Sequence, residues 1–141
     1  MSARYLLDEN VLSEPLRLTP NARVLARLDA ATGQLALPTV VWHEMVYGAA
    51  RLQHSRRREY IERYLAQVVL PAMPLFPYDQ EAAEWHAKER ARLEKRGSPP
   101  TFVDGQIAAV AATRGLILVS RNVRDFERFD GVELENWFDA D

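Results

Sequence analysis

Cysteine is absent from the 141-residue sequence. Its absence excludes disulfide bonds, thiolate nucleophiles and metal sites built on sulfur. Histidine is also scarce, and the spacing of the three that are present, His43, His54 and His86, matches no zinc motif. A zinc hydrolase is therefore disfavoured. A chain without cysteine suits a reducing compartment, and we expect a cytoplasmic protein.

Long apolar runs are absent as well. No segment approaches the roughly 18–20 apolar residues that a membrane-spanning helix needs. The first residues lead into a short apolar run that Asp8 interrupts, which is unlike a signal peptide. We therefore expect no association with a membrane.

An excess of positive charge is also missing, because the formal net charge is −2. Lys88 and Lys95 are the only lysines, and the other basic residues are arginines. Arginine is the better bidentate ligand for phosphate, but genomic base composition explains the same bias. The charge balance alone neither supports nor excludes an RNA substrate.

Short apolar segments alternate with amphipathic helical patterns along the chain. Strands are expected at residues 5–7, 34–38, 75–76, 116–119 and 132–134, and helices at about 19–33, 39–54, 56–68, 79–96 and 101–114. Thr19 is expected to cap the first helix, with Pro20 as its first residue. This alternation predicts an α/β fold with three layers and a central parallel sheet of about four to five short strands. We expect one domain over residues 1–141.

Acidic residues fall where the expected strands end or the expected helices begin. Asp8 closes the first strand, and Asn122 and Asp125 follow the most apolar strand. Ligands of parallel sheets bind beyond the carboxyl ends of the strands, so these residues are candidates for a site. Glu44 and Asp104 lie near the starts of two helices, and they join the site if both helix starts point to the same edge.

Several carboxylates in one cleft repel one another, and a divalent cation removes that conflict. Mg²⁺ and Mn²⁺ prefer oxygen ligands, and they use a few carboxylates together with water and substrate phosphate. Such an ion orients a phosphodiester and lowers the pKa of an attacking water. The acids therefore point to metal-dependent phosphodiester chemistry.

Each acid also has a purely structural explanation. Asp8 is placed to cap the turn that follows its strand, and Asp104 fits a capping box with Thr101. Glu44 and Asp125 are placed to form surface ion pairs, with Arg51 for the first and with Arg121 or Arg128 for the second. The residues by themselves leave both explanations open.

The chain contains four short motifs: residues 5–14 (YLLDENVLSE), 42–48 (WHEMVYG), 104–109 (DGQIAA) and 118–126 (LVSRNVRDF). In this order and spacing they resemble the PIN-domain family, specifically its single-domain ribonuclease toxins of the VapC and FitB type. The resemblance covers nearly the whole chain. It implies a PIN-like fold and an endoribonuclease that depends on Mg²⁺ or Mn²⁺.

The resemblance also assigns roles to individual residues. By matching position, Asp8, Glu44 and Asp104 would be the metal carboxylates, with Asp125 as a fourth catalytic acid. Four further residues are expected to support the acids or contact substrate: Asn10, Arg121, Asn122 and Arg124. Family members differ over whether the position of Asn122 or that of Asp125 carries the acid. Glu9 is a departure, because the family commonly has threonine there.

Partners follow from the resemblance too. It implies a homodimer and a cognate antitoxin whose C-terminal segment blocks the active site, with DNA contacted only through the antitoxin. Tyr60, Tyr64 and Trp85 are aromatic residues at helical spacing, and they belong either to a dimer face or to the core.

Four other functions compete with this interpretation. A haloacid-dehalogenase-like phosphatase needs a second aspartate two residues after Asp8, where this sequence has Asn10. A response-regulator receiver needs a phosphoacceptor aspartate and a late lysine, and neither is evident. A flap endonuclease needs further regions that clamp DNA. A PIN-like module that binds without turnover is the remaining rival, and the presence of all the expected acids argues against it.

Overall fold

Residues 2–139, which the computed structural model describes, contain a parallel sheet of five strands. The strands are β1 (Tyr5–Leu7), β2 (Leu35–Pro38), β3 (Leu75–Phe76), β4 (Ile117–Val119) and β5 (Leu134–Glu135). Their spatial order is β3-β2-β1-β4-β5, and every neighbouring pair is parallel. The predicted parallel sheet is confirmed. The last strand begins later than expected, because its pairing with β4 starts at Leu134.

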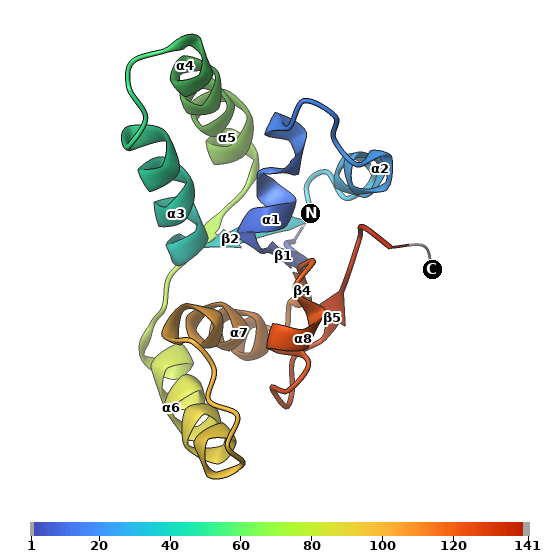
Figure 1. Ribbon diagram of the computed structural model, residues 1–141. Helices are drawn as coiled ribbons and strands as arrows, with labels where there is room; N and C mark the ends of the chain where they lie inside the picture. Colours follow the sequence, from blue (N-terminus) through green and yellow to red (C-terminus); the bar gives the residue numbers. More distant parts are fainter. Residues whose placement is uncertain (1, 140–141) are drawn as a thin grey trace.

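Helices cover both faces of this sheet (Figure 1). They are α1 (Glu9–Leu12), the 3₁₀ helix η1 (Glu14–Leu16), α2 (Ala22–Ala30), α3 (Thr39–Ala50), α4 (Arg56–Arg63), the π-helical η2 (Tyr64–Val69), α5 (Leu70–Ala72), α6 (Gln80–Lys95), α7 (Phe102–Arg114) and α8 (Val123–Phe126). Figure 1 shows α1 and α2 on one side of the sheet and α6 and α7 on the other, while α3 and α4 form a projecting pair. The predicted three-layer α/β/α architecture is confirmed.

The start of α2 differs from the prediction. Its N-cap is Asn21, whose side chain accepts hydrogen bonds from the N–H groups of Arg23 and Val24. The N–H of Asn21 donates to the buried carboxylate of Glu14 at 2.7 Å. Because this bond holds Asn21 in an extended conformation, the helix cannot begin earlier. The expectation that Thr19 caps the helix was therefore wrong.

Other helix boundaries agree more closely. Asp79 caps α6 and Thr101 caps α7, each by accepting the N–H of the residue three positions later. Gly115 ends α7 in the left-handed region, at φ 64°, which suits a residue without a β-carbon. Helix α3 ends at Ala50, before the predicted end at His54, because Arg51 already serves as its C-cap.

The aromatic residues considered for a dimer face divide between core and surface. Tyr64 packs against the core, and its hydroxyl donates to the carbonyl of Leu12 at 2.8 Å. Trp85 also packs against the core, beside Phe129. Tyr60 is 46% exposed. In the part of the chain that the structure describes, no helix is long and apolar enough to cross a membrane.

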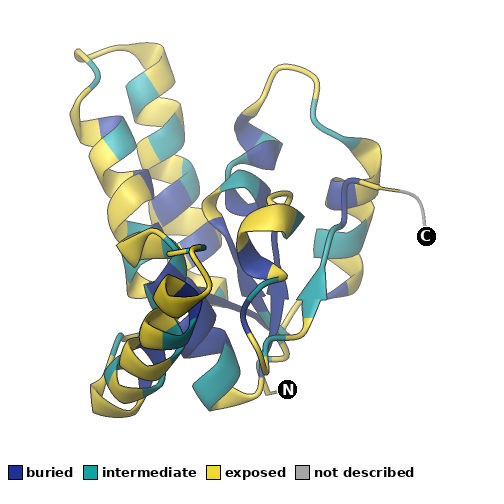
Figure 2. Ribbon diagram, turned by 60° about the horizontal axis from the view of Figure 1, so that its bottom comes forward, coloured by how far each residue is buried: buried dark blue, intermediate teal, exposed yellow. Residues whose placement is uncertain are grey.

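The carboxyl ends of β1 and β4 lie side by side at one edge of the sheet. β4 is buried throughout and β1 is buried at Leu6 and Leu7 (Figure 2), and helix α7 packs on the sheet with a buried face of small and branched residues. The chain passes from β1 to β2 and β3 on one side of the sheet, and then to β4 and β5 on the other. The strand order therefore reverses between β1 and β4, and α/β proteins bind ligands beyond the carboxyl ends of strands at such a point.

Candidate active site

Asp8 is the first residue after β1 and lies at this carboxyl edge of the sheet. It is 8% exposed and caps α1, because its Oδ1 accepts the N–H of Glu9 at 2.8 Å. Its Oδ2 accepts the hydroxyl of Ser120 at 2.7 Å and the amide of Asn10 at 3.4 Å. The predicted structural role of Asp8 as a cap is therefore present, and the same carboxylate also faces the residue that follows β4.

Ser120 is a residue that sequence reasoning missed. It is fully buried directly after β4, donates to Asp8 and accepts the N–H of Asn122 at 2.9 Å. Asn10 makes a second link, since its Oδ1 accepts the N–H of Arg121 at 3.1 Å. Both links join the end of β1 to the end of β4. The signal available in the sequence was the polar residue that ends its most apolar strand.

Asp104 reaches the same edge of the sheet from the other direction along the chain. Helix α7 feeds the parallel strand β4, so it runs back along the sheet and its first turn lies at the carboxyl edge. The N–H of Asp104 donates to Thr101 at 3.1 Å, which confirms the predicted cap. The cap and a metal-binding role are compatible, because Asp104 also lies within electrostatic range of Asp8 and Asp125.

The electrostatics of this group are repulsive. Burial raises the pKa of Asp104, and the negative charges of Asp125 and Asp8 raise it further, against the opposing effects of Thr101 and Arg128. Burial likewise raises the pKa of Asp8, which the charge of Asp125 also increases, although hydrogen bonds such as that from Ser120 lower it. A cation placed among these carboxylates would oppose both shifts.

Glu44 is linked to these carboxylates by Glu9, which lies within electrostatic range of both Asp8 and Glu44. Burial raises the pKa of Glu9, and the nearby charges of Asp8 and Glu44 raise it further. Glu9 and Glu44 also line one groove of about 380 Å³ beside α3. Glu44 lies 3.5 Å from Nδ1 of His43, whereas the guanidinium of Arg51 lies over the ring of Tyr47. The expected pairing of Glu44 with Arg51 is therefore replaced by these two contacts.

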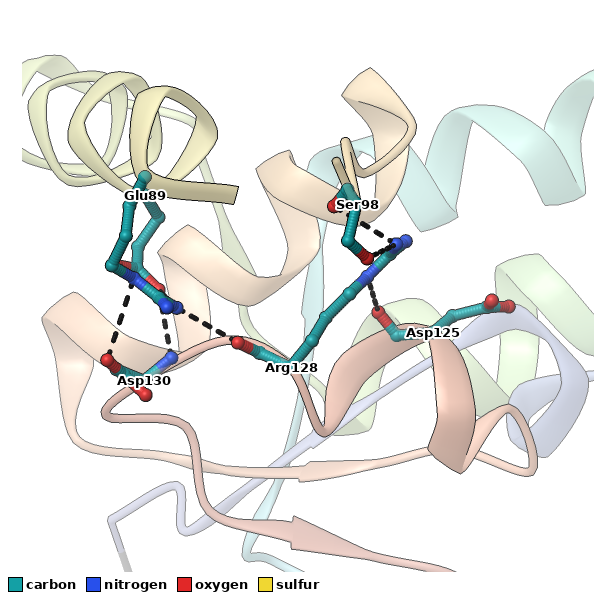
Figure 3. Close-up of polar contacts among 6 residues, drawn as sticks. Glu89, Ser98, Asp125, Arg128 and Asp130 are labelled. Carbon is teal, nitrogen blue, oxygen red and sulfur yellow. Dashed lines mark hydrogen bonds and ion pairs between the residues drawn. The ribbon is translucent and has the colours of Figure 1, made fainter. Parts of the chain in front are cut away.

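Asp125 lies on the short helix α8, and Arg128 follows two residues after the end of that helix (Figure 3). The expected side-chain pair between them is not the contact that forms. Arg128 instead donates to the backbone carbonyl of Asp125 at 3.1 Å and to the hydroxyl of Ser98 at 3.1 Å, and the Asp125 carboxylate points away from it. Arg128 thus lies close enough to lower the pKa of Asp104. Sequence reasoning had treated Arg128 only as a counter-charge.

The other two arginines of this segment lie on the surface, and their predicted contact with substrate stays a prediction. The guanidinium of Arg121 packs over the ring of Phe138 at 4.6 Å, so in this conformation it is held away from Asp125. Arg124 lies in the last turn of α8 and is exposed.

The donor set fits a hard divalent cation. The grouped side chains offer oxygen atoms alone, which Mg²⁺ and Mn²⁺ prefer. Among residues 2–139, no group of three or more acidic or histidine side chains is arranged to hold a metal ion. Mg²⁺ does not need such a group, because it commonly takes one or two carboxylates and fills its other positions with water and phosphate. Asp8 and Asp104 are suited to that role.

The chain is similar to known proteins over nearly its full length. The family profile described as PIN domain matches residues 5–132. The chain is 32% identical over 135 residues to the tRNA(fMet)-specific endonuclease VapC of Shigella flexneri. The aligned region spans 95% of this chain and 98% of that protein. It is 33% identical over 137 residues to toxin FitB of Neisseria gonorrhoeae, with 95% and 99% covered. The crystal structure of FitAcB from Neisseria gonorrhoeae superposes with a TM-score of 0.90, at 32% identity, and covers 96% of this chain and 99% of that one.

Proposed function

The chain belongs to the PIN-domain family, and from this we propose that it is a metal-dependent endoribonuclease and the toxin of a type II toxin–antitoxin module. The observation that carries the proposal is the set of mutually repelling carboxylates at the point where the strand order reverses. The family relationship supports RNA as the substrate. We further propose that the chain acts as one domain over residues 1–141, because all five strands share one sheet.

Each residue of the site has a role in the proposed reaction. Asp8 and Asp104 would hold Mg²⁺ or Mn²⁺, and Glu44 and Asp125 would complete the acidic site. When bound, the ion would orient the scissile phosphodiester, stabilise its developing charge and acidify the attacking water. Ser120 keeps one oxygen of Asp8 in a fixed position.

The relatives also suggest partners. We propose that a cognate antitoxin binds this chain, that two copies of the chain form a homodimer, and that DNA is contacted only through the antitoxin. We propose that the protein works in the cytoplasm, where its RNA substrate and its antitoxin would both be present.

Purified protein is expected to cleave single-stranded RNA in Mg²⁺ or Mn²⁺ and to stop cleaving in excess EDTA, because the donor atoms are oxygens of carboxylates. Cleavage of a labelled oligonucleotide, followed on a denaturing gel, measures this. Protein carrying Asp104→Asn and prepared in the same way is the control for contaminating nucleases. Activity that persists in EDTA, or that zinc alone restores, would contradict the assignment.

An antitoxin segment is expected to inhibit by placing an arginine near Asp8, Glu44 and Asp104. A guanidinium forms charge-assisted hydrogen bonds with carboxylates, and it can occupy a carboxylate site in place of a cation. Replacing that arginine by glutamine should weaken inhibition by at least about tenfold, as loss of a charged hydrogen bond predicts. A co-crystal structure with the partner far from these acids, and with access to them unchanged, would show that inhibition works in another way.

A further inference from the structure

Two residues of α3 and its C-cap residue form an exposed row beside the acidic site. His43, Tyr47 and Arg51 are spaced four residues apart, so they lie on one face of the helix. The rings of His43 and Tyr47 are nearly parallel, at 8°, with centroids 6.1 Å apart. The guanidinium carbon of Arg51 lies 5.9 Å from the centre of the Tyr47 ring. We call this row the α3 stacking surface.

The core does not account for these side chains. Tyr47 is 54% exposed, and the side chain of His43 is 69% exposed. The residues of α3 that face the core are Val41, Met45 and Ala49, on the other side of the helix. Two rings and a guanidinium are therefore exposed to solvent and available to a ligand.

The α3 stacking surface is continuous with the proposed active site. His43 contacts Glu44 at 3.5 Å. Arg51, at the other end of the row, lines the groove of about 380 Å³ that Glu9, Glu44, Arg17 and Arg57 also line, whereas neither ring lines that groove. An RNA strand that passes from Glu44 over this face of α3 would thus meet the two rings and, at Arg51, the arginines of the groove.

We propose that the α3 stacking surface binds unpaired bases of single-stranded RNA next to the cleaved bond, with Tyr47 and His43 under the bases and Arg51 on a phosphate. The proposal rests on the endoribonuclease function proposed above. Aromatic rings bind single-stranded nucleic acid because every base has a flat face, and each stacked base contributes about 1–3 kcal/mol. Arginine is the residue best suited to phosphate beside an acidic site. Two exposed rings beside a guanidinium match the bases and phosphates of an RNA strand better than they match an apolar peptide.

Binding of a fluorescein-labelled 12-nucleotide RNA, measured by anisotropy in Mg²⁺, tests this surface. The Asp104→Asn protein serves as background so that the RNA is not cut. Adding Tyr47→Ala is expected to weaken binding by about 5- to 100-fold, which is the loss of one or more stacked bases. Tyr47→Phe should bind within about twofold of the background, because the ring is retained.

Tyr60→Ala is the matched control, since Tyr60 is a similarly exposed tyrosine on α4. It should leave RNA binding unchanged. A series of RNAs with a single abasic nucleotide gives a second test, because at the stacked position the difference between Tyr47 and alanine should disappear. Arg51→Ala should reduce the slope of log affinity against log salt by about one, whereas Tyr47→Ala should leave that slope intact.

Three results would overturn the proposal. Tyr47→Ala could bind RNA as tightly as Tyr60→Ala does, it could change the oligomeric state in sedimentation velocity, or it could weaken antitoxin binding while RNA binding stays intact. The cleavage assay of the wild-type protein separates this proposal from the proposed function. Cleavage without an effect of Tyr47 removes the stacking surface alone, and Tyr47-dependent binding without cleavage removes the nuclease function alone.

Discussion

Asp104→Asn is expected to yield a folded protein that cleaves RNA at least about 100-fold more slowly than the wild type, because the proposed catalytic cation would lose one negative ligand. The substitution keeps the size of the side chain. It also keeps the backbone N–H that donates to Thr101, so the cap of α7 survives. Single-turnover cleavage with the labelled oligonucleotide measures the effect.

The stability of the same variant is expected to change in the opposite direction. Because the folded-state pKa of Asp104 is raised above its ordinary value of 3.8, its contribution to stability is present below that value and is lost as pH rises through the folded pKa. At neutral pH the ionised carboxylate therefore opposes folding of the metal-free protein. Without metal, Asp104→Asn should melt at the same or a higher temperature than the wild type. Its thermal shift on adding Mg²⁺ should be smaller.

Asp79→Asn is the matched control for Asp104→Asn. Asp79 caps α6 by accepting the N–H of Ala82 at 2.9 Å, and it forms an ion pair with Arg114 at 3.6 Å. Asparagine caps helices about as well as aspartate, so stability should change little and cleavage should persist. If Asp104→Asn behaved in the same way, with wild-type cleavage, Asp104 would be a cap alone and the proposed site would lack a ligand.

The positions of Asp8 and Asp104 could be predicted because they depend on local signals. A polar residue that ends an apolar strand marks the carboxyl edge, and Thr101 followed by Asp104 marks a helix start. The parallel direction of β4 then brings that helix start back to the same edge. The sheet itself was predicted for the same reason, since its short apolar strands alternate with helices.

What sequence reasoning missed depends on contacts between distant residues. The start of α2 is set by the Glu14 carboxylate, which reaches seven residues ahead to Asn21. The link from Ser120 to Asp8 spans 112 residues, and no local pattern announces it. The guanidinium of Arg128 donates to Ser98, in the loop before α7, and not to the carboxylate of Asp125 as expected. This contact could not be predicted because α8 and that loop meet only in the folded chain.

Gly105, the residue after Asp104, carries the last of these distant contacts. A β-carbon built on Gly105 would lie 1.9 Å from Nε2 of His86 on α6. His86 is 1% exposed, its Nδ1 hydrogen-bonds the hydroxyl of Tyr78 at 2.8 Å, and its ring packs against Phe102. The ring therefore cannot withdraw without breaking that bond or opening the core. Glycine is what allows α6 and α7 to approach this closely.

Gly105→Ala is consequently expected to destabilise the protein, although replacing glycine by alanine inside a helix normally adds about 0.5–1 kcal/mol of stability. Overpacking of a buried contact costs about 1–3 kcal/mol, and here it should exceed that gain. Thermal unfolding should show a melting temperature lower by roughly 3–8 °C. Gly48→Ala is the matched control, because a β-carbon there meets no atom within 4 Å, and it should leave stability level or higher.

A double-mutant cycle locates the cause of this destabilisation. In a His86→Ala background, Gly105→Ala should lose most of its cost, because the ring that it strikes is gone. Gly105→Ala alone should also slow RNA cleavage at temperatures where the protein is folded, since any displacement of the first turn of α7 moves Asp104. If Gly105→Ala proved as harmless as Gly48→Ala, the close approach of α6 to α7 would not be what positions Asp104.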